Sequence, residues 1–149
     1  KVAVLLAGTN NVGKTVPPEG DAEKVADITR GLHAILRVIE AKAPDAVIIL
    51  MGIFPRNDGM AVMPTIDKIN RNLSGLADGK RIRYLNINAK LADSKGRLFD
   101  GMSHDGLHPT VKGYQVWADA LKPIFRELLG PPAKEDLAPP PTGDPSAGR

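Results

Sequence analysis

The densest group of chemically active side chains lies between residues 100 and 110. This stretch reads Asp-Gly-Met-Ser-His-Asp-Gly-Leu-His-Pro-Thr, so two histidines and two aspartates fall within nine residues. Asp105 comes three residues before His108, close enough for a turn to bring its carboxylate onto the imidazole. A histidine whose tautomer is fixed by a carboxylate is the usual general base for a hydroxyl nucleophile. We therefore take His108 and Asp105 as a candidate acid–base pair.

Two other interpretations of this stretch remain open. The pair could be an incidental charge contact in a solvated loop. Alternatively, His104 and His108, four residues apart, could bind a metal ion together with a nearby aspartate. Histidine ligands at that spacing normally lie on a helix, whereas the glycine and proline that flank His108 favour a loop. We therefore expect no metal site, and we treat His104 and Asp100 as surface residues.

A second motif follows the first apolar run of the chain. Residues 8–15 match the nucleotide-binding pattern Gly-x-x-x-x-Gly-Lys-Thr. A phosphate-binding loop needs a helix that starts at the Gly-Lys-Thr, and an aspartate after a neighbouring strand to hold magnesium. Here Pro18 and Gly20 would break that helix, and neither later strand segment ends in an acid. Nucleotide binding at residues 8–15 is therefore a minor alternative.

The elements that must position these residues follow from the apolar pattern. Three short segments are expected to be buried strands: residues 2–6, 46–50 and 81–87. Three longer segments have helical spacing: about residues 21–43, 60–77 and 110–129. Strands that alternate with helices indicate a parallel sheet with helices on its faces. Because ligands bind at the carboxyl ends of such strands, the loops that start at Gly8, Gly52 and Asn88 should share one rim with His108.

Several side chains carry more specific expectations. Asp21 is expected to cap the first helix, and residues 88–109 are expected to form a long loop. We expect Arg56 to be solvated, although it could also meet an anionic group. Tyr114 and Trp117 are expected to be core residues of the last helix.

Composition and charge argue against several classes of protein. The net charge is only +3, and with three Phe, two Tyr and one Trp the chain gives little support to nucleic-acid binding. No apolar run is long enough to span a bilayer. The absence of cysteine excludes disulfides, thiol catalysis and cysteine metal sites. At 149 residues we expect one domain over residues 1–129, followed by a flexible proline-rich tail over residues 130–149.

Three blocks carry a resemblance to a known family. Residues 105–109 (Asp-Gly-Leu-His-Pro), with Gly-Tyr at 113–114, resemble the last conserved block of the SGNH (GDSL-type) hydrolases. Residues 8–11 (Gly-Thr-Asn-Asn) are similar to the family's Gly-x-Asn-Asp block, with asparagine in the last position, where aspartate is commoner. Residues 48–56 are similar to a strand and loop of the acetylhydrolase-like branch, which includes the platelet-activating-factor acetylhydrolase catalytic subunits. The resemblance covers about residues 1–129.

This resemblance implies a three-layer α/β/α flavodoxin-like fold and a serine esterase or acylhydrolase that needs no cofactor. His108 would act as general base and acid, Asp105 would orient it, and Asn10 would donate its amide N–H to the oxyanion. Three further residues would contact the substrate: Gly8, Phe54 and Leu107. The substrate would be a small-molecule ester, with a short acyl group such as acetyl on a carbohydrate or lipid.

The nucleophile block of the family is not found in the sequence. Its Gly-Asp-Ser turn, and a glycine that donates a second oxyanion N–H, would precede Lys1. None of the chain's own serines follows a strand in the required way: Ser74, Ser94, Ser103 and Ser146. We therefore expect a C-terminal portion of a hydrolase domain that lacks its N-terminal strand or strands. We expect this portion to be inactive unless an upstream segment or a second chain supplies the serine. The alternative is a non-catalytic binding module that keeps the fold.

Overall fold

A parallel sheet forms the centre of the molecule. The computed structural model of the chain describes residues 1–17 and 21–135. The strands lie in the order β1 (Val2–Leu5), β2 (Val47–Met51) and β3 (Ile82–Leu85). Leu5 pairs with Leu50, which pairs in turn with Tyr84, so the strands end at one common edge. The predicted parallel α/β sheet is confirmed.

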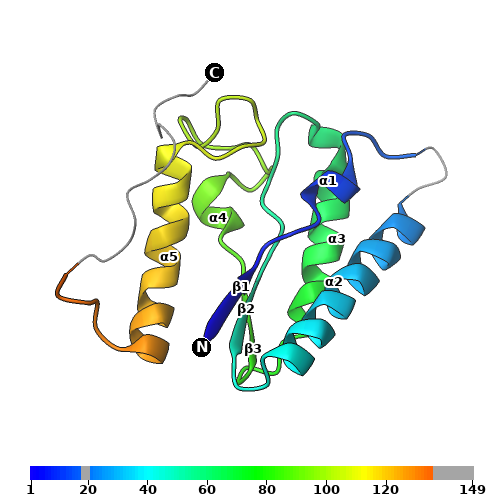
Figure 1. The fold of residues 1–149 in the computed structure, drawn as a ribbon. Coiled ribbons are helices and arrows are strands. Elements are labelled where there is room, and N and C mark those ends of the chain that lie inside the picture. Colours follow the sequence, from blue (N-terminus) through cyan, green and yellow to red (C-terminus); the bar gives the residue numbers. More distant parts are fainter. Residues whose placement is uncertain (18–20, 136–149) are drawn as a thin grey trace.

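Helices cover both faces of this sheet and give the predicted three layers (Figure 1). On one face lie α2 (Ala22–Lys42) and α3 (Met63–Ser74), and on the other lie α4 (Asn88–Leu91) and α5 (Val111–Leu129).

The central strand explains why two hydrophobic cores form. Successive side chains of a strand point to opposite faces, so Ile48 and Leu50 pack with α2 and α3. Ile49 and Met51 pack instead with residues of α4 and α5. Each of the four side chains is at most 1% exposed. A strand buried on both faces reads as a continuous apolar run, which is why it could be predicted.

The first helix follows its predicted stripe, but its start differs from the prediction. Asp21 lies at the N-cap position of α2, yet its side chain makes no capping hydrogen bond. Its buried carboxylate instead accepts hydrogen bonds from Thr65 Oγ1 and, at 2.9 Å, from Lys68 Nζ. The capping prediction was therefore wrong, because a partner on α3 competes for the carboxylate. Asp21 ties the start of α2 to α3.

The second predicted helix is shorter than the pattern over residues 60–77 suggested. It consists of a 3-10 turn, η1 (Met60–Val62), followed by α3, which ends at Ser74 before Gly75. Asp78 lies beyond the end of this helix. Its carboxylate accepts the backbone N–H groups of Lys80 and Ile82, and it thereby forms the turn into β3.

The expected long loop over residues 88–109 carries structure of its own. It begins with α4, and two isolated antiparallel bridges, Ala92 with Leu98 and Ser103 with Pro109, fold the rest into compact turns. Thr110 then caps α5, because its hydroxyl accepts the backbone N–H of Gly113 at 3.2 Å. The loop prediction was too coarse, since short turns leave no periodic signal in the sequence.

Two predictions concern the outer parts of the chain. Across residues 1–17 and 21–135, none of the helices combines the length and apolar character that a membrane crossing requires. Most of the predicted proline-rich tail, from residue 136 to residue 149, lies outside the described residues.

Candidate active site

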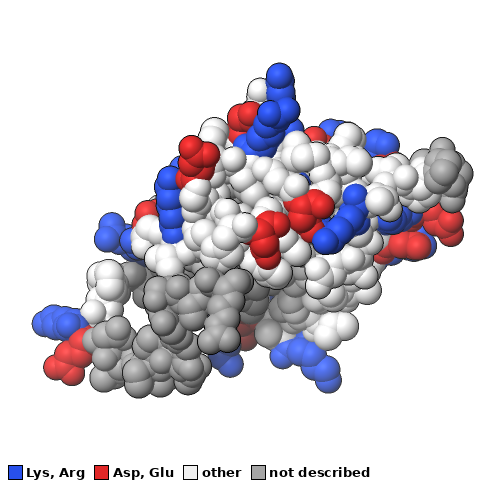
Figure 2. Space-filling view, turned by 90° about the horizontal axis from the view of Figure 1, so that it is seen from above, with Lys and Arg blue, Asp and Glu red and all other residues white. Residues whose placement is uncertain are grey.

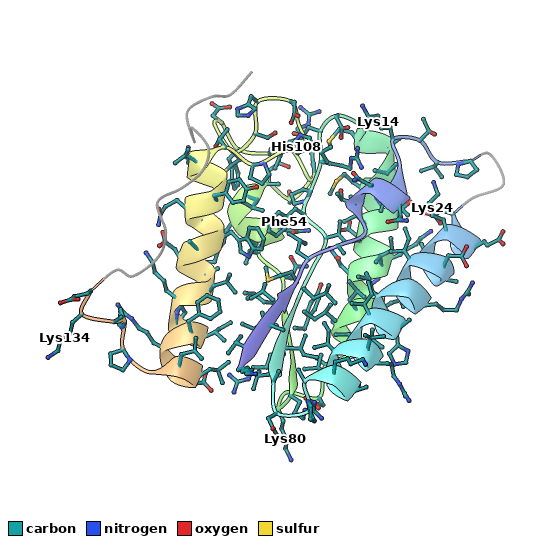
Figure 3. All side chains as sticks on the ribbon, viewed as in Figure 1. Lys14, Lys24, Phe54, Lys80, His108 and Lys134 are labelled. Atoms are coloured by element: carbon teal, nitrogen blue, oxygen red, sulfur yellow. The ribbon has the colours of Figure 1, made fainter. Side chains whose placement is uncertain are left out.

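Three loops meet where the strands end. The loop after β1 contains α1 (Thr9–Val12), the loop after β2 contains Phe54, and the segment after β3 leads to His108. All three lie at the same end of the sheet, as expected for parallel strands (Figures 1 and 3). Viewed onto this end, acidic and basic side chains are interspersed over the surface (Figure 2).

Asp105 and His108 form the predicted pair. The carboxylate oxygen Oδ2 of Asp105 lies 2.6 Å from Nδ1 of His108. The other oxygen accepts the backbone N–H groups of Leu107 at 2.9 Å and of His108 at 2.8 Å. Hydrogen bonds from the His108 imidazole and from these N–H groups hold the pKa of Asp105 well below its usual range.

The protonation of this pair follows from the donor inventory. An ionised carboxylate only accepts hydrogen bonds, so Nδ1 of His108 must carry the proton that it shares with Asp105. In a neutral imidazole this leaves the lone pair on Nε2, which can then take a proton from a hydroxyl group. The His108 side chain is 72% exposed, so water or another molecule can reach it.

The Asp105–His108 turn depends on a glycine between the two residues. Gly106 has a φ of +79°, a conformation that side chains rarely adopt. A Cβ at this position would lie 2.7 Å from the backbone nitrogen of Asp58. Because there is none, the carbonyl of Gly106 accepts the backbone N–H of Asn57 at 2.6 Å. The histidine turn is thus fastened to the loop after β2.

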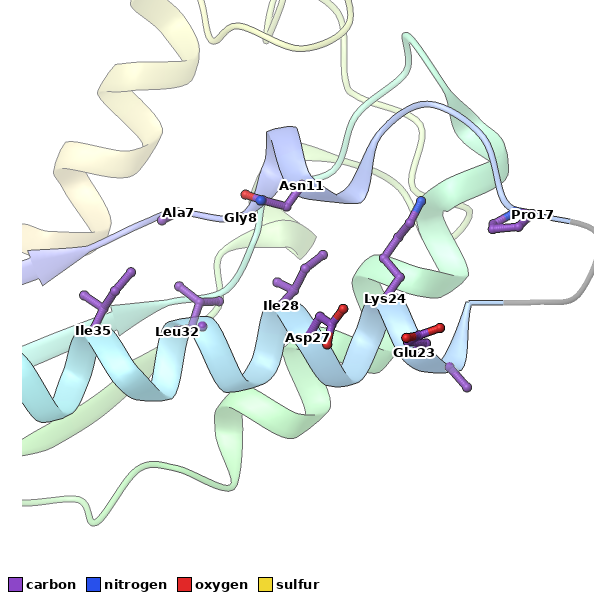
Figure 4. A pocket seen from close by; sticks show the side chains of 12 residues that line it. Ala7, Gly8, Asn11, Pro17, Glu23, Lys24, Asp27, Ile28, Leu32 and Ile35 are labelled. Carbon is purple, nitrogen blue, oxygen red and sulfur yellow. The ribbon is translucent and has the colours of Figure 1, made fainter.

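Asn10 lies on the loop after β1, in the short helix α1, and its side chain is exposed. Gly8 immediately precedes the helix, and its φ of +107° lets the chain turn sharply out of the strand. Gly8 and Asn11 line a groove of about 820 Å³ between α1 and α2, together with Lys24 and Ile28 (Figure 4). Gly8 therefore faces a different hollow from the other two residues predicted to contact substrate.

Phe54 and Leu107 come together at a small apolar pocket of about 10 Å³, which Ser103 also lines. The ring of Phe54 meets Trp117 edge to face, with 5.3 Å between centroids. Trp117 also stacks on Tyr114. Tyr114 is 55% exposed, so its prediction as a core residue was wrong. It lies in the first turn of α5, where its ring stacks on Trp117.

The prediction for Arg56 was also wrong. Arg56 was expected in solvent, but it is only 2% exposed. Its Nε and Nη2 donate to the two carboxylate oxygens of Asp58, each at 2.7 Å, and its Nη1 donates to the carbonyl of Thr9 at 2.8 Å. The acid two residues later was the available signal, since a buried guanidinium needs such a partner.

The nucleotide-binding pattern does not form a phosphate loop. The helix α1 ends before Gly13, and residues 13–17 are not helical, so no helix starts at the Gly-Lys-Thr. Lys14 extends toward the loop after β2, where its Nζ lies 3.3 Å from Asp58.

Within the described residues, no serine hydroxyl forms a hydrogen bond with the imidazole of His108. The hydroxyl of Ser103 donates to Asp105 at 3.1 Å, and that of Ser74 donates to the carbonyl of Arg71. Ser146 lies outside the described residues. Within residues 1–17 and 21–135, no group of three or more His, Asp or Glu side chains gathers closely enough to hold a metal ion.

Comparison with known proteins gives a consistent result. Residues 1–116 match the model of the GDSL-like lipase/acylhydrolase family. The chain is 30% identical over 140 residues to platelet-activating factor acetylhydrolase IB subunit alpha2 from Gallus gallus, covering 93% of this chain and 57% of the relative. The alpha1 subunit from Homo sapiens is 30% identical over 134 residues, covering 87% and 53%. The chain thus spans a little over half the length of these curated relatives.

Solved structures agree on the fold. A Streptococcus pneumonia structure, provisionally named as a platelet activating factor, superposes with a TM-score of 0.68 at 28% identity, covering 83% of this chain and 59% of that one. A carbohydrate esterase family 3 structure from Talaromyces cellulolyticus superposes with a TM-score of 0.59 at 20% identity, covering 85% and 57%. At that lower identity the likeness concerns the fold alone.

Proposed function

The chain belongs to the GDSL-like lipase/acylhydrolase family, and on that premise we propose that Asp105 and His108 are the acid–base pair of a serine esterase. The observation that carries this proposal is the 2.6 Å contact between the Asp105 carboxylate and His108 Nδ1. This contact leaves Nε2 as the proton acceptor. The Asp105–His108 pair lies at the edge of the sheet where such folds bind their ligands.

The reaction would proceed by acyl transfer through a serine. His108 Nε2 takes the proton of the serine hydroxyl while the oxygen attacks the ester carbonyl. The side-chain N–H of Asn10 donates to the oxyanion of the tetrahedral intermediate. His108 then gives its proton to the leaving alcohol, and a water molecule, deprotonated by His108, hydrolyses the acyl-enzyme. Asp105 holds the imidazole in the required tautomer throughout.

The serine would be supplied by an upstream segment or by a second chain. This part of the proposal is motivated by the hydroxyl contacts within the described residues, because that of Ser103 goes to Asp105 and not to His108. The span of about half of the curated relatives is compatible with a further segment.

We propose a short acyl group for the substrate. The pocket lined by Phe54 and Leu107 holds only about 10 Å³, close to the space of one water molecule, so an acyl group of any length must lie outside it or displace its side chains. Two relatives are named acetylhydrolases, which is compatible with an acetyl ester. Gly8, which lines the groove between α1 and α2, would contribute through its backbone.

The test is hydrolysis of p-nitrophenyl acetate by the full-length protein and two histidine variants. We expect His108→Ala to lower kcat by at least about 10⁴-fold, the range seen when a member of a triad is removed. His104→Ala is the matched control, because it lies in the same turn and is exposed. Unchanged turnover in His108→Ala would remove His108 from the role of base. Equal losses in both variants would indicate disruption of the turn.

A non-catalytic binding module is the second candidate. It is favoured by the same observation that Ser103 is bonded to Asp105 rather than to the imidazole. The discriminating measurement is labelling of the full-length protein with a fluorophosphonate, which reacts only with an activated serine. Labelling that depends on His108 supports the esterase, whereas its absence supports the binding module.

A further inference from the structure

A buried ion pair lies between the two halves of the proposed site. Arg56 and Asp58 follow β2, and their side chains are 3% and 11% exposed. The guanidinium and the carboxylate are joined by two parallel hydrogen bonds of 2.7 Å. This pairing lowers the pKa of Asp58, so both groups stay charged. Burial of two charges contributes little net stability, because their desolvation opposes their attraction. The pair therefore calls for an explanation other than stability.

The guanidinium reaches the loop that carries the proposed oxyanion donor. Its remaining nitrogen, Nη1, donates at 2.8 Å to the carbonyl of Thr9, which is 47 positions away in the sequence. Thr9 immediately precedes Asn10 in α1. Only a planar fork can serve a carboxylate with two nitrogens and a carbonyl with a third, so lysine cannot reproduce these contacts.

The same segment also holds the histidine turn. The carbonyl of Gly106 accepts the backbone N–H of Asn57 at 2.6 Å and that of Asp58 at 3.4 Å. The Asn57 side chain is fixed in turn, since its amide donates to the carbonyl of Gly96 and its oxygen accepts the N–H of Leu98. A continuous set of contacts therefore runs from Thr9 through Arg56 and Asp58 to the turn between Asp105 and His108.

We infer that Arg56 is a positioning residue that sets the Asn10 loop and the Asp105–His108 turn relative to each other. This inference rests on the proposed esterase function. The oxyanion donor and the base lie about 100 positions apart in the sequence, and they must act on one carbonyl group. A misplacement of about 1 Å in such an arrangement can cost about 10²-fold in rate. Arg56 would act through its neighbours and would not contact the substrate.

The first test measures the two loops without reference to activity. Amide hydrogen exchange is followed by NMR in the full-length protein, in Arg56→Lys and in Asp58→Asn. We expect faster exchange in both variants at Asn11 and Val12 of α1 and at Leu107 and His108 of the turn, all of which donate hydrogen bonds in the structure. Exchange in β2 should be unchanged.

Arg83→Lys is the matched control for this test. Arg83 is a partly buried arginine of β3 whose Nη1 pairs with Glu127 at 2.8 Å, near the C-terminal end of α5 and away from the rim. It should leave exchange in both loops unchanged. Unaltered exchange in Arg56→Lys and Asp58→Asn would overturn the inference. Because Asp58→Asn keeps the shape of the side chain, it decides the matter should the lysine variant fail to fold.

The second test measures kinetics on p-nitrophenyl acetate. We expect Arg56→Lys to lower kcat by about 10–100-fold with little change in KM, because the oxyanion donor and the base are misaligned whereas substrate binding is kept. In an Asn10→Ala background the same substitution should cost a smaller factor, since the two residues act as a unit. If the fold-losses in kcat of the two single variants multiply in the double variant, Arg56 does not act through Asn10. A wild type without esterase activity would refute the proposed function, whereas the exchange result would still decide whether Arg56 links the loops.

Discussion

Replacing Asp105 with asparagine tests the histidine tautomer without dismantling the turn. In the structure, Oδ1 of Asp105 accepts hydrogen bonds from the Ser103 hydroxyl and from the backbone N–H groups of Leu107 and His108. The amide oxygen of asparagine can keep all three contacts. Its nitrogen then occupies the place of Oδ2, which lies 2.6 Å from His108 Nδ1. A nitrogen that only donates requires Nδ1 to accept, so the proton moves to Nε2.

The expected loss follows from this change of tautomer. With the proton on Nε2, His108 cannot take the proton of a serine. The equivalent substitution in a buried triad costs about 10⁴ in kcat. Here the carboxylate is 49% exposed and the imidazole 72%, so water can compete for both partners and reduce the penalty. We therefore expect Asp105→Asn to lower kcat on p-nitrophenyl acetate by about 10²–10⁴-fold, with KM changed by less than about twofold.

The assay is steady-state hydrolysis at pH 7 by the full-length protein. Because the pKa of Asp105 is held below its ordinary value of 3.8, the wild-type carboxylate is ionised at pH 7. The comparison therefore reports the change of tautomer together with the loss of the charge that stabilises the imidazolium. Asp100→Asn is the matched control, since Asp100 lies in the same segment and is exposed. If Asp105→Asn keeps kcat within about threefold of the wild type, the assignment of Asp105 as the orienting group is refuted.

Three further predictions concern Asn10, Gly106 and Asp21. Asn10→Ala should lower kcat by about 10²–10³-fold through loss of an oxyanion donor, whereas the neighbouring Asn11→Ala should not; equal kinetics in the two would rule out Asn10 as that donor. Gly106→Ala should lower both Tm and kcat, because its Cβ would lie 2.7 Å from a backbone nitrogen. Gly79→Ala has a similar φ of +72° but open space around the new Cβ, so it should lower the free energy of unfolding by only about 1–2 kcal/mol. Thermal unfolding of the two variants separates the effect of the clash from that of backbone strain. Asp21→Asn should destabilise the protein at pH 7, since hydrogen bonds from a hydroxyl and an ammonium group of α3 lower the pKa of Asp21. Because the pKa of Asp21 is lowered in the folded state, its ionised carboxylate stabilises the protein above pH 3.8, and this stabilisation is lost as the pH falls through the folded-state pKa. Urea unfolding should therefore show that the difference in the free energy of unfolding between wild type and Asp21→Asn shrinks below about pH 4. A difference that does not depend on pH would contradict this prediction.

The elements could be predicted from the sequence because their signals are local. The buried strand β2 is a continuous apolar run, and the stripes of α2 and α3 repeat at helical spacing. The histidine turn could be predicted for the same reason, since Asp105 reaches His108 across only two residues.

The contacts that join the loops could not be predicted in this way. The burial of Arg56 depends on Thr9, which is 47 positions away, and on the packing of three loops at one rim. The acid at Asp58 was visible, but a charged pair in sequence does not reveal whether it is buried. Asp21 was misjudged for a similar reason, because its partner Thr65 is 44 positions away and comes close only once α2 and α3 pack. Tyr114 fits the helical spacing of α5, but this spacing alone does not reveal which turn of the helix the core covers.

Trapping of the acyl-enzyme tests the role of His108 most directly. The full-length protein is mixed with p-nitrophenyl acetate, quenched within milliseconds and analysed by peptide mass spectrometry, alongside His108→Ala and the control His104→Ala. We predict one acetyl group on a single serine in the wild type and in His104→Ala, and none in His108→Ala over the same time. Acetylation of a serine at the same rate without His108, or turnover with no acetylated serine, would contradict the central claim that His108 activates a serine nucleophile.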